Sequence, residues 1–151
     1  MRPDAISRGV AYALATNRDH IAVAPAVVAP GVLLGMLIGT FIMFFSAYAR
    51  PWRAPDPRSR CFIGIGAFNL VRVEAYRAVG GHSRIAMRPD DDLKLGKIIK
   101  DAGYSQEMLF GREVVSVEWY PSLGALVRGL EKNTLAGMNY SVTAIIVSAF
   151  A

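Results

Sequence analysis

The sequence predicts a mixed α/β fold, because amphipathic helical segments alternate with short segments of strand-like pattern. In the helical segments apolar residues recur at helical spacing, whereas between Glu113 and Trp119 they alternate with polar ones. The chain has 151 residues, enough for one domain, and 53% of them are hydrophobic, which is high for a soluble domain. This high apolar content indicates that the α/β fold is accompanied by a strongly apolar segment.

The first predicted helix begins at Ala5 and ends near Asn17. Asp4 stands in the N-cap position, where a carboxylate can accept hydrogen bonds from free backbone N–H groups. Ile6 and Val10 lie four residues apart and belong to its apolar side. This segment is expected to be a short amphipathic helix.

A long apolar run follows over residues 21–49, which contain no charged side chain. Pro25 and Pro30 divide the run, because proline inside a helix removes a hydrogen bond and clashes with the preceding turn. The second part, residues 31–49, approaches the ~20 residues that cross a bilayer. By its pattern it is either a transmembrane span or an interfacial or core helix.

Basic residues come directly after this apolar segment. Arg50, Arg53, Arg58 and Arg60 are interleaved with Trp52 and with prolines, and the chain as a whole carries a net charge of +5. Basic and aromatic side chains at an apolar boundary suit the headgroup zone of a cytoplasmic leaflet. No nucleic-acid-binding motif accompanies them, so no nucleic acid is expected as a partner.

Two further helices are predicted in the middle of the chain. Residues 64–72 form a glycine-punctuated strand or loop that leads into a helix, and Gly80–Gly81 ends that helix. Asp90–Asp92 opens the next helix, which Gly103 ends. The middle of the chain thus adds a strand and two helices.

The last predicted strand, Glu113 to Trp119, is followed by a helix for which Ser122 is the N-cap. Leu123, Leu126, Val127 and Leu130 are expected on the apolar side of that helix. Residues 134–151 again lack charge, and we expect them to begin a C-terminal membrane helix.

The acidic triplet Asp90–Asp92 is the sharpest local feature, and it has two interpretations. One aspartate caps the helix and the others are attracted to its positive end. Alternatively, one carboxylate faces a cleft as a general base, and its like-charged neighbours raise its pKa.

Two other segments are candidate binding elements. Gly66, Ala67 and Asn69 would let a backbone approach a ligand, or they mark a tight packing site. Arg128 and Lys132 lie four residues apart, with Asn133 adjacent, and form either a solvated helical face or a clamp for phosphate. The histidines and the single cysteine form no ligand cluster, so no metal site is expected in this chain.

Three stretches in order carry a family resemblance: GIGAFNLVRVEAYRAVGG, then DDLKLGKIIKDAGY, then RGLEKN. Together they resemble the family 2 glycosyltransferases of GT-A type, especially the processive and ceramide-glucosyltransferase-like members. The resemblance covers residues 3–138 and implies the acceptor-side half of a GT-A domain. Residues 1–133 would be a partial glycosyltransferase domain, and residues 134–151 the beginning of a membrane helix.

The resemblance assigns roles to the candidate residues. Asp91 and Asp92 correspond to the acidic pair that opens the catalytic helix, with Asp92 as the base. Gly66, Ala67 and Asn69 occupy the loop that lines the acceptor and diphosphate side of the cleft. Arg128, Lys132 and Asn133 stand where the family has a basic motif near the donor diphosphate, although the tryptophan of that motif is missing here.

The resemblance also implies parts that this sequence does not contain. Such enzymes bind Mg²⁺ or Mn²⁺ through a D-x-D motif in a preceding nucleotide-binding half. No D-x-D stands in a strand-end setting here, and Asp90–Asp92 matches the later acidic motif instead. The expectation is a C-terminal half with little activity alone, for which a separate donor-binding chain is one conceivable partner.

The expected function is sugar transfer from a nucleotide-sugar donor to a lipid or glycan hydroxyl. The resemblance favours an interfacial helix over a span for residues 31–49, in a membrane-associated protein whose active-site side is cytoplasmic. Two alternatives stay open: a non-catalytic membrane-associated partner subunit, and an anionic-lipid-binding protein that uses the arginines after the apolar helix.

Overall fold

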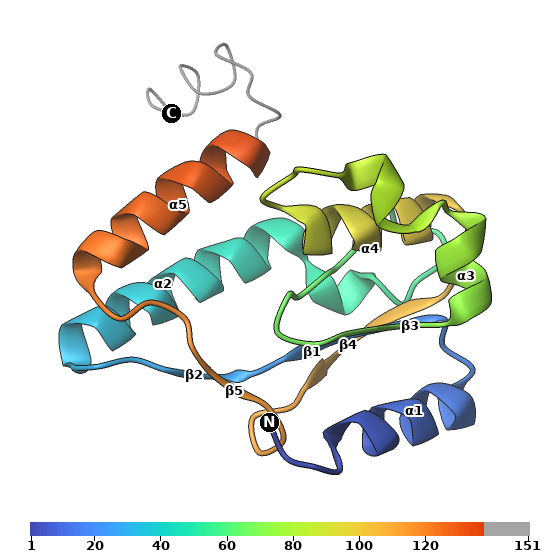
Figure 1. The fold of residues 1–151 in the computed structure, drawn as a ribbon, viewed down its shortest axis with the longest axis horizontal. Coiled ribbons are helices and arrows are strands. Elements are labelled where there is room, and N and C mark those ends of the chain that lie inside the picture. Colours follow the sequence, from blue (N-terminus) through green and yellow to red (C-terminus); the bar gives the residue numbers. More distant parts are fainter. Residues whose placement is uncertain (138–151) are drawn as a thin grey trace.

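The computed structural model describes residues 1–137, and for residues 132–137 it describes the backbone alone. Its helices are α1 (Ala5–Thr16), α2 (Val32–Ala49), α3 (Val73–Ala78), α4 (Asp91–Asp101) and α5 (Leu123–Gly137), with short 3-10 helices η1 (Pro51–Arg53) and η2 (Gly81–Ile85). Its strands are β1 (His20–Ala24), β2 (Ala26–Val28), β3 (Asn69–Val71), β4 (Gln106–Phe110) and β5 (Ser116–Glu118). The predicted mixed α/β class is confirmed (Figure 1).

Strand β1 is the centre of a three-stranded sheet, with β3 antiparallel on one side and β4 parallel on the other. After Pro25 the chain continues as β2, which pairs in parallel with β5. The sequence pattern did not predict β1, β2 or β4. Residues 20–23 are all buried, so β1 lacks the polar–apolar alternation of a half-exposed strand.

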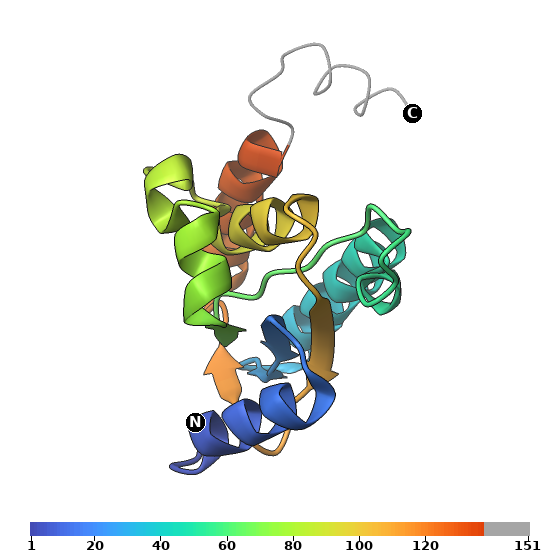
Figure 2. The same cartoon turned by 90° about the vertical axis from the view of Figure 1, so that its right-hand side faces the viewer.

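Helices cover both faces of this sheet (Figures 1 and 2). Helix α1 packs on one face, where its Tyr12 and Ala13 meet the buried Ile21 and Val23 of β1. Helices α2, α4 and α5 lie on the opposite side. Because side chains alternate along a strand, His20 and Ala22 point away from α1, toward the side that holds α4.

Helix α2 realises the helix predicted over residues 31–49, but only part of it is buried. Leu34 and Ile38 pack with Leu126 of α5. On the expected apolar side of α5, Leu126 is buried, whereas Leu123 and Val127 are 41% and 55% exposed. The packing in this cluster therefore covers only part of that side.

The other predicted helices agree with the structure at most boundaries. Helix α1 spans the expected residues, but the Asp4 side chain makes no capping hydrogen bond. Ser122 does cap α5, since its hydroxyl accepts the Ala125 N–H at 3.2 Å. The membrane helix predicted over residues 134–151 starts inside α5, and residues 138–151 lie outside the described residues.

Candidate functional site

The candidate site forms where the loop of residues 63–67 crosses the first turns of α4. Gly64 and Gly96 make this crossing possible, because a Cβ on Gly64 would overlap the Asp92 carbonyl and a Cβ on Gly96 would overlap the Ile63 carbonyl. Loop and helix therefore touch backbone to backbone. Two motifs that are separate in the sequence, the glycine loop and the acidic triplet, are thereby brought together.

Asp92 is the aspartate of the triplet that faces this loop. Its Oδ2 accepts the Gly66 N–H at 2.6 Å, and its Oδ1 accepts the Leu93 N–H at 2.7 Å. Burial raises the pKa of the Asp92 carboxyl, the two N–H groups pull it down, and the charges of Asp91 and Asp90 add to the rise. The net effect is a raised pKa, which makes this carboxylate a stronger proton acceptor than an exposed aspartate.

The other two aspartates have different surroundings. Asp90 is 8% exposed and forms an ion pair with Arg88 at 2.9 Å, with Lys94 at 3.8 Å as a second cation. Asp91 is exposed, and its Oδ1 accepts the Asp92 N–H at 2.8 Å. Asp90 stands at the N-cap of α4 but makes no side-chain capping hydrogen bond, since its carboxylate pairs with the two cations, whereas Asp91 satisfies one free N–H group.

The three loop residues of the predicted binding set divide into two kinds. Gly66 and Ala67 are exposed beside Asp92, where a ligand can reach their backbone. Asn69 instead turns its Oδ1 inward, where that atom accepts the Ile65 N–H at 3.3 Å and lies 2.9 Å from His20 Nε2. Its carbonyl oxygen is therefore committed to the protein interior.

The predicted basic group belongs to α5. Arg128 is exposed there, and among the described contacts none joins it to Asp92 or Gly66. Lys132 and Asn133 lie in the same helix, but their side chains are outside the described residues. Both views place the C-terminal end of α5 on the same side of the sheet as α4 (Figures 1 and 2).

Sequence reasoning missed His20 and Gln106, which connect the sheet to the glycine loop. Both are fully buried, and Gln106 Oε1 accepts the Ile63 N–H at 2.7 Å. Each opens a strand, β1 or β4, that the pattern did not predict. The available signal was weak: His20 stands directly before the apolar run IAVA, and Gln106 stands two residues before the run MLF, with Glu107 between. Only the parallel pairing of the two strands makes these positions informative.

The residues of the described part do not suit a divalent metal ion. No group of three or more His, Cys, Asp or Glu side chains converges there. Magnesium and manganese take several oxygen ligands, whereas Asp90 is neutralised by Arg88 and both oxygens of Asp92 accept backbone N–H groups.

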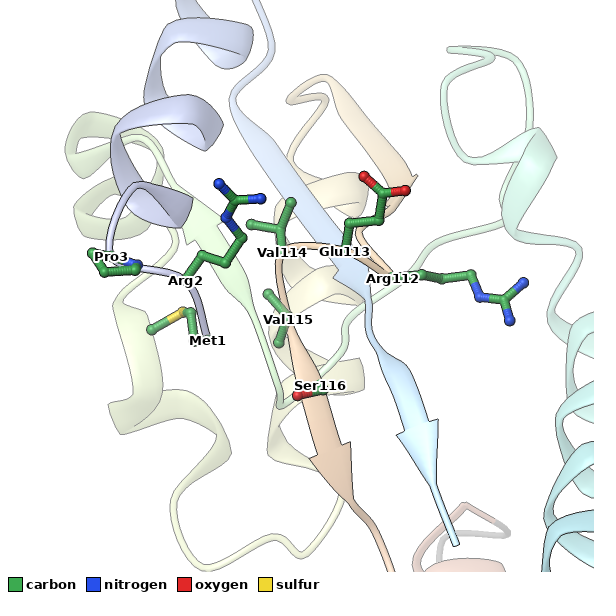
Figure 3. A pocket seen from close by; sticks show the side chains of 8 residues that line it. All are labelled: Met1, Arg2, Pro3, Arg112, Glu113, Val114, Val115 and Ser116. Atoms are coloured by element: carbon green, nitrogen blue, oxygen red, sulfur yellow. The ribbon is translucent and has the colours of Figure 1, made fainter.

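The two described surface cavities lie elsewhere. Figure 3 shows a cavity of about 360 Å³ lined by residues 1–3 and 112–116. A second cavity, of about 200 Å³, lies between α1 and the sheet, and Gly9, Phe68 and Leu109 contribute to its walls. None of the predicted site residues lines either of these two cavities.

Asp92, Gly66 and Ala67 are thus the predicted residues that come together in the described structure, at the N-terminal end of α4. The arrangement can accept a proton from a hydroxyl group placed beside the glycine loop. Comparison of the chain with protein-family models, with curated proteins and with solved structures gave no match.

Proposed function

We propose that the chain is the acceptor-side part of a membrane-associated glycosyltransferase, which moves a sugar from a nucleotide-sugar donor to a hydroxyl of a lipid or glycan. The observation that carries the proposal is the half-buried Asp92 carboxylate, held 2.6 Å from the Gly66 N–H. The sequence resemblance supplies the reaction class, and this geometry supplies a carboxylate suited to accept a proton.

In the proposed reaction Asp92 is the general base. Its carboxylate accepts the proton of the acceptor hydroxyl while the hydroxyl oxygen attacks the anomeric carbon of the donor sugar. The bond from that carbon to the donor diphosphate breaks, and the diphosphate leaves with the bonding electrons. The raised pKa of Asp92 increases its affinity for the transferred proton. Inversion at the anomeric carbon is what the resemblance implies.

The remaining predicted residues take supporting roles in this proposal. Gly66 and Ala67 are exposed beside Asp92 and would border the acceptor. Arg128, with Lys132 and Asn133, would lie nearer the donor diphosphate, where an arginine fork suits phosphate oxygens. The nucleotide and its Mg²⁺ or Mn²⁺ ion would be bound by a donor-binding segment or chain beyond the residues described here.

The membrane part of the proposal is supported by the surface of α2. Together with η1 it forms a helix over Val32–Arg53 with a mean hydropathy of 2.0, long and apolar enough to cross a membrane. Length and composition of one such helix are weak evidence for a span. Leu34 and Ile38 pack on Leu126 of α5, so we infer that α2 lies along the bilayer surface with its opposite face in lipid.

One specific observation favours a second candidate function, binding of anionic lipid without catalysis. Trp52 is 64% exposed, and Arg53, Arg58 and Arg60 are exposed around it, directly after the apolar surface of α2. Arginines next to an apolar helix attract anionic headgroups. The two functions differ at Asp92, because a lipid-binding protein needs no general base.

Replacement of Asp92 by asparagine in the encoding gene, in the cell that naturally makes the protein, tests the enzymatic proposal. Asparagine keeps the size of the side chain and removes the base, so we expect at least one membrane glycolipid or glycan to form about 100-fold more slowly. Pulse labelling with radioactive sugar measures that rate.

Asp101→Asn is the matched control, because Asp101 is exposed at the opposite end of α4 and, among the described contacts, its side chain pairs with Lys97 rather than with the site. Its labelling pattern should match that of the wild type. Near-normal labelling in Asp92→Asn would remove Asp92 from the base role and leave lipid binding as the better interpretation.

A further inference from the structure

A buried polar network joins the sheet to the loop that carries the candidate site. His20 and Gln106 are both 0% exposed and are register partners in the parallel pair of β1 and β4. Gln106 Nε2 lies 2.6 Å from His20 Nδ1, and His20 Nε2 lies 2.9 Å from Asn69 Oδ1. Buried polar side chains are destabilising unless they are hydrogen-bonded, and these three satisfy one another.

The direction of each hydrogen bond follows from two backbone groups. The Ile63 N–H is a donor, so Gln106 directs its Oε1 toward it, and the Gly96 carbonyl is an acceptor, so it faces Gln106 Nε2 at 3.1 Å. Gln106 Nε2 must then donate to His20 Nδ1 as well. His20 is therefore neutral, and it donates its Nε2–H to Asn69, in keeping with burial, which lowers the pKa of His20.

The network holds the glycine loop at two residues. Gln106 accepts the Ile63 N–H, and Asn69 accepts the Ile65 N–H at 3.3 Å. The next donor along the chain is the Gly66 N–H, which lies 2.6 Å from Asp92 Oδ2. The peptide unit that donates to Asp92 is thus directly attached to the residue that Asn69 binds.

We propose that His20, with Gln106 and Asn69, is a positioning residue, because the network keeps the 65–66 peptide unit turned so that the Gly66 N–H stays on the Asp92 carboxylate. The catalytic meaning of this inference rests on the proposed function, in which Asp92 is the base.

The network controls the hydrogen bond from the Gly66 N–H, which lowers the pKa of Asp92. The charged groups that act on Asp92 are Asp91 and Asp90 of its own helix. The loop packed against it, residues 63–67, contributes backbone N–H groups and contains no charged side chain. A loss of the Gly66 N–H would leave the Leu93 N–H as the remaining donor to Asp92, against burial and two like charges, so the pKa of Asp92 would rise further.

The experiment is a titration of the Asp92 side-chain carboxyl by ¹³C NMR, in the full chain in mild detergent. His20→Phe fills the same space without either hydrogen bond, and we expect it to raise the pKa of Asp92 by about one unit and to shift the Gly66 amide resonance. His20→Gln can accept at one end and donate at the other, so it should restore the wild-type pKa.

Ile21→Val is the matched control, since Ile21 is equally buried in β1 but faces α1 and lies outside the network. It should leave the pKa of Asp92 unchanged. If His20→Phe fails to fold, Asn69→Ala at its half-buried position removes the acceptor of the Ile65 N–H and must give the same rise.

An unchanged pKa of Asp92 in whichever of these variants folds would overturn the inference, and so would an equal rise in Ile21→Val. The titration needs no sugar donor or acceptor, so a failure to find sugar transfer does not affect it. Conversely, sugar transfer by the Asp92→Asn variant would rule out Asp92 as the base. It would not change the conclusion that the titration gives about the network.

Discussion

At the scale of single residues, two glycines decide whether the candidate site can form. Gly64 and Gly96 let the loop and α4 meet at their backbones, and the atoms in the way of a side chain are carbonyl groups that cannot move independently. From the sequence alone, Gly64 can be interpreted only as part of a glycine-rich loop, and Gly96 only as one residue within a predicted helix. Which glycine is needed for close packing depends on what lies opposite, and that is known only once the loop has been placed on α4.

We predict that Gly64→Ala lowers the free energy of unfolding by about 3 kcal/mol, at the upper end of the usual cost of overpacking. Urea unfolding in mild detergent, followed by circular dichroism, measures this. Gly39→Ala is the control, because Gly39 lies inside α2 with nothing within 4 Å of the place that a methyl group would take, and alanine there should stabilise the helix by up to about 1 kcal/mol. Equal effects of the two changes would contradict the close packing at Gly64.

At the scale of elements, α2 is apolar all round but is used on one side only. Leu34 and Ile38 are buried, whereas Val32, Met36, Phe44 and Tyr48 are between 64% and 87% exposed. The sequence predicts the helix and its length correctly. It cannot reveal which stripe packs inward, because every position of the helix carries a residue that could be buried.

The exposed side of α2 leads to a prediction about membrane binding. Phe44→Glu should weaken binding to anionic lipid vesicles by about 10-fold or more, since burial of a phenylalanine side chain stabilises by roughly 1.5–3 kcal/mol. Co-sedimentation with the vesicles measures the bound fraction. Phe110→Glu is the control: Phe110 is 78% exposed against 65% for Phe44, but it ends β4 rather than lying on α2. Similar losses in both variants would show that α2 is not the binding surface.

At the scale of the whole molecule, the described domain is assembled from segments far apart in the sequence. The network residue His20 precedes its partner Gln106 by 86 positions, and the sheet order is β3–β1–β4. Local patterns gave the class, the helices and the acidic triplet. They could not give the pairing of β1 with β4, which depends on contacts across the chain. Nor did they distinguish Asp92 from its two neighbours, for which the sequence analysis relied on the family resemblance.

The packing of α2 against the body of the domain predicts one topology in the membrane. If α2 lies along the bilayer, α1 and α3 stay on the same side of it, whereas a span would separate them. We expect Ala11→Cys and Ala78→Cys, both at exposed positions, to react with a membrane-impermeant maleimide from the same side in a Cys61→Ser background. Labelling of the two positions from opposite sides of sealed vesicles would establish a span instead.

The exposed side of α2 also determines how the protein behaves once it has been extracted from lipid. In plain buffer water cannot solvate that surface favourably, so copies will tend to cover it with one another. In a particle of several copies formed under such conditions, contacts between the copies would bury the surface that lipid covers in the membrane. The size of such a particle would vary with detergent and protein concentration. Such a particle should not be interpreted as the quaternary structure of the protein.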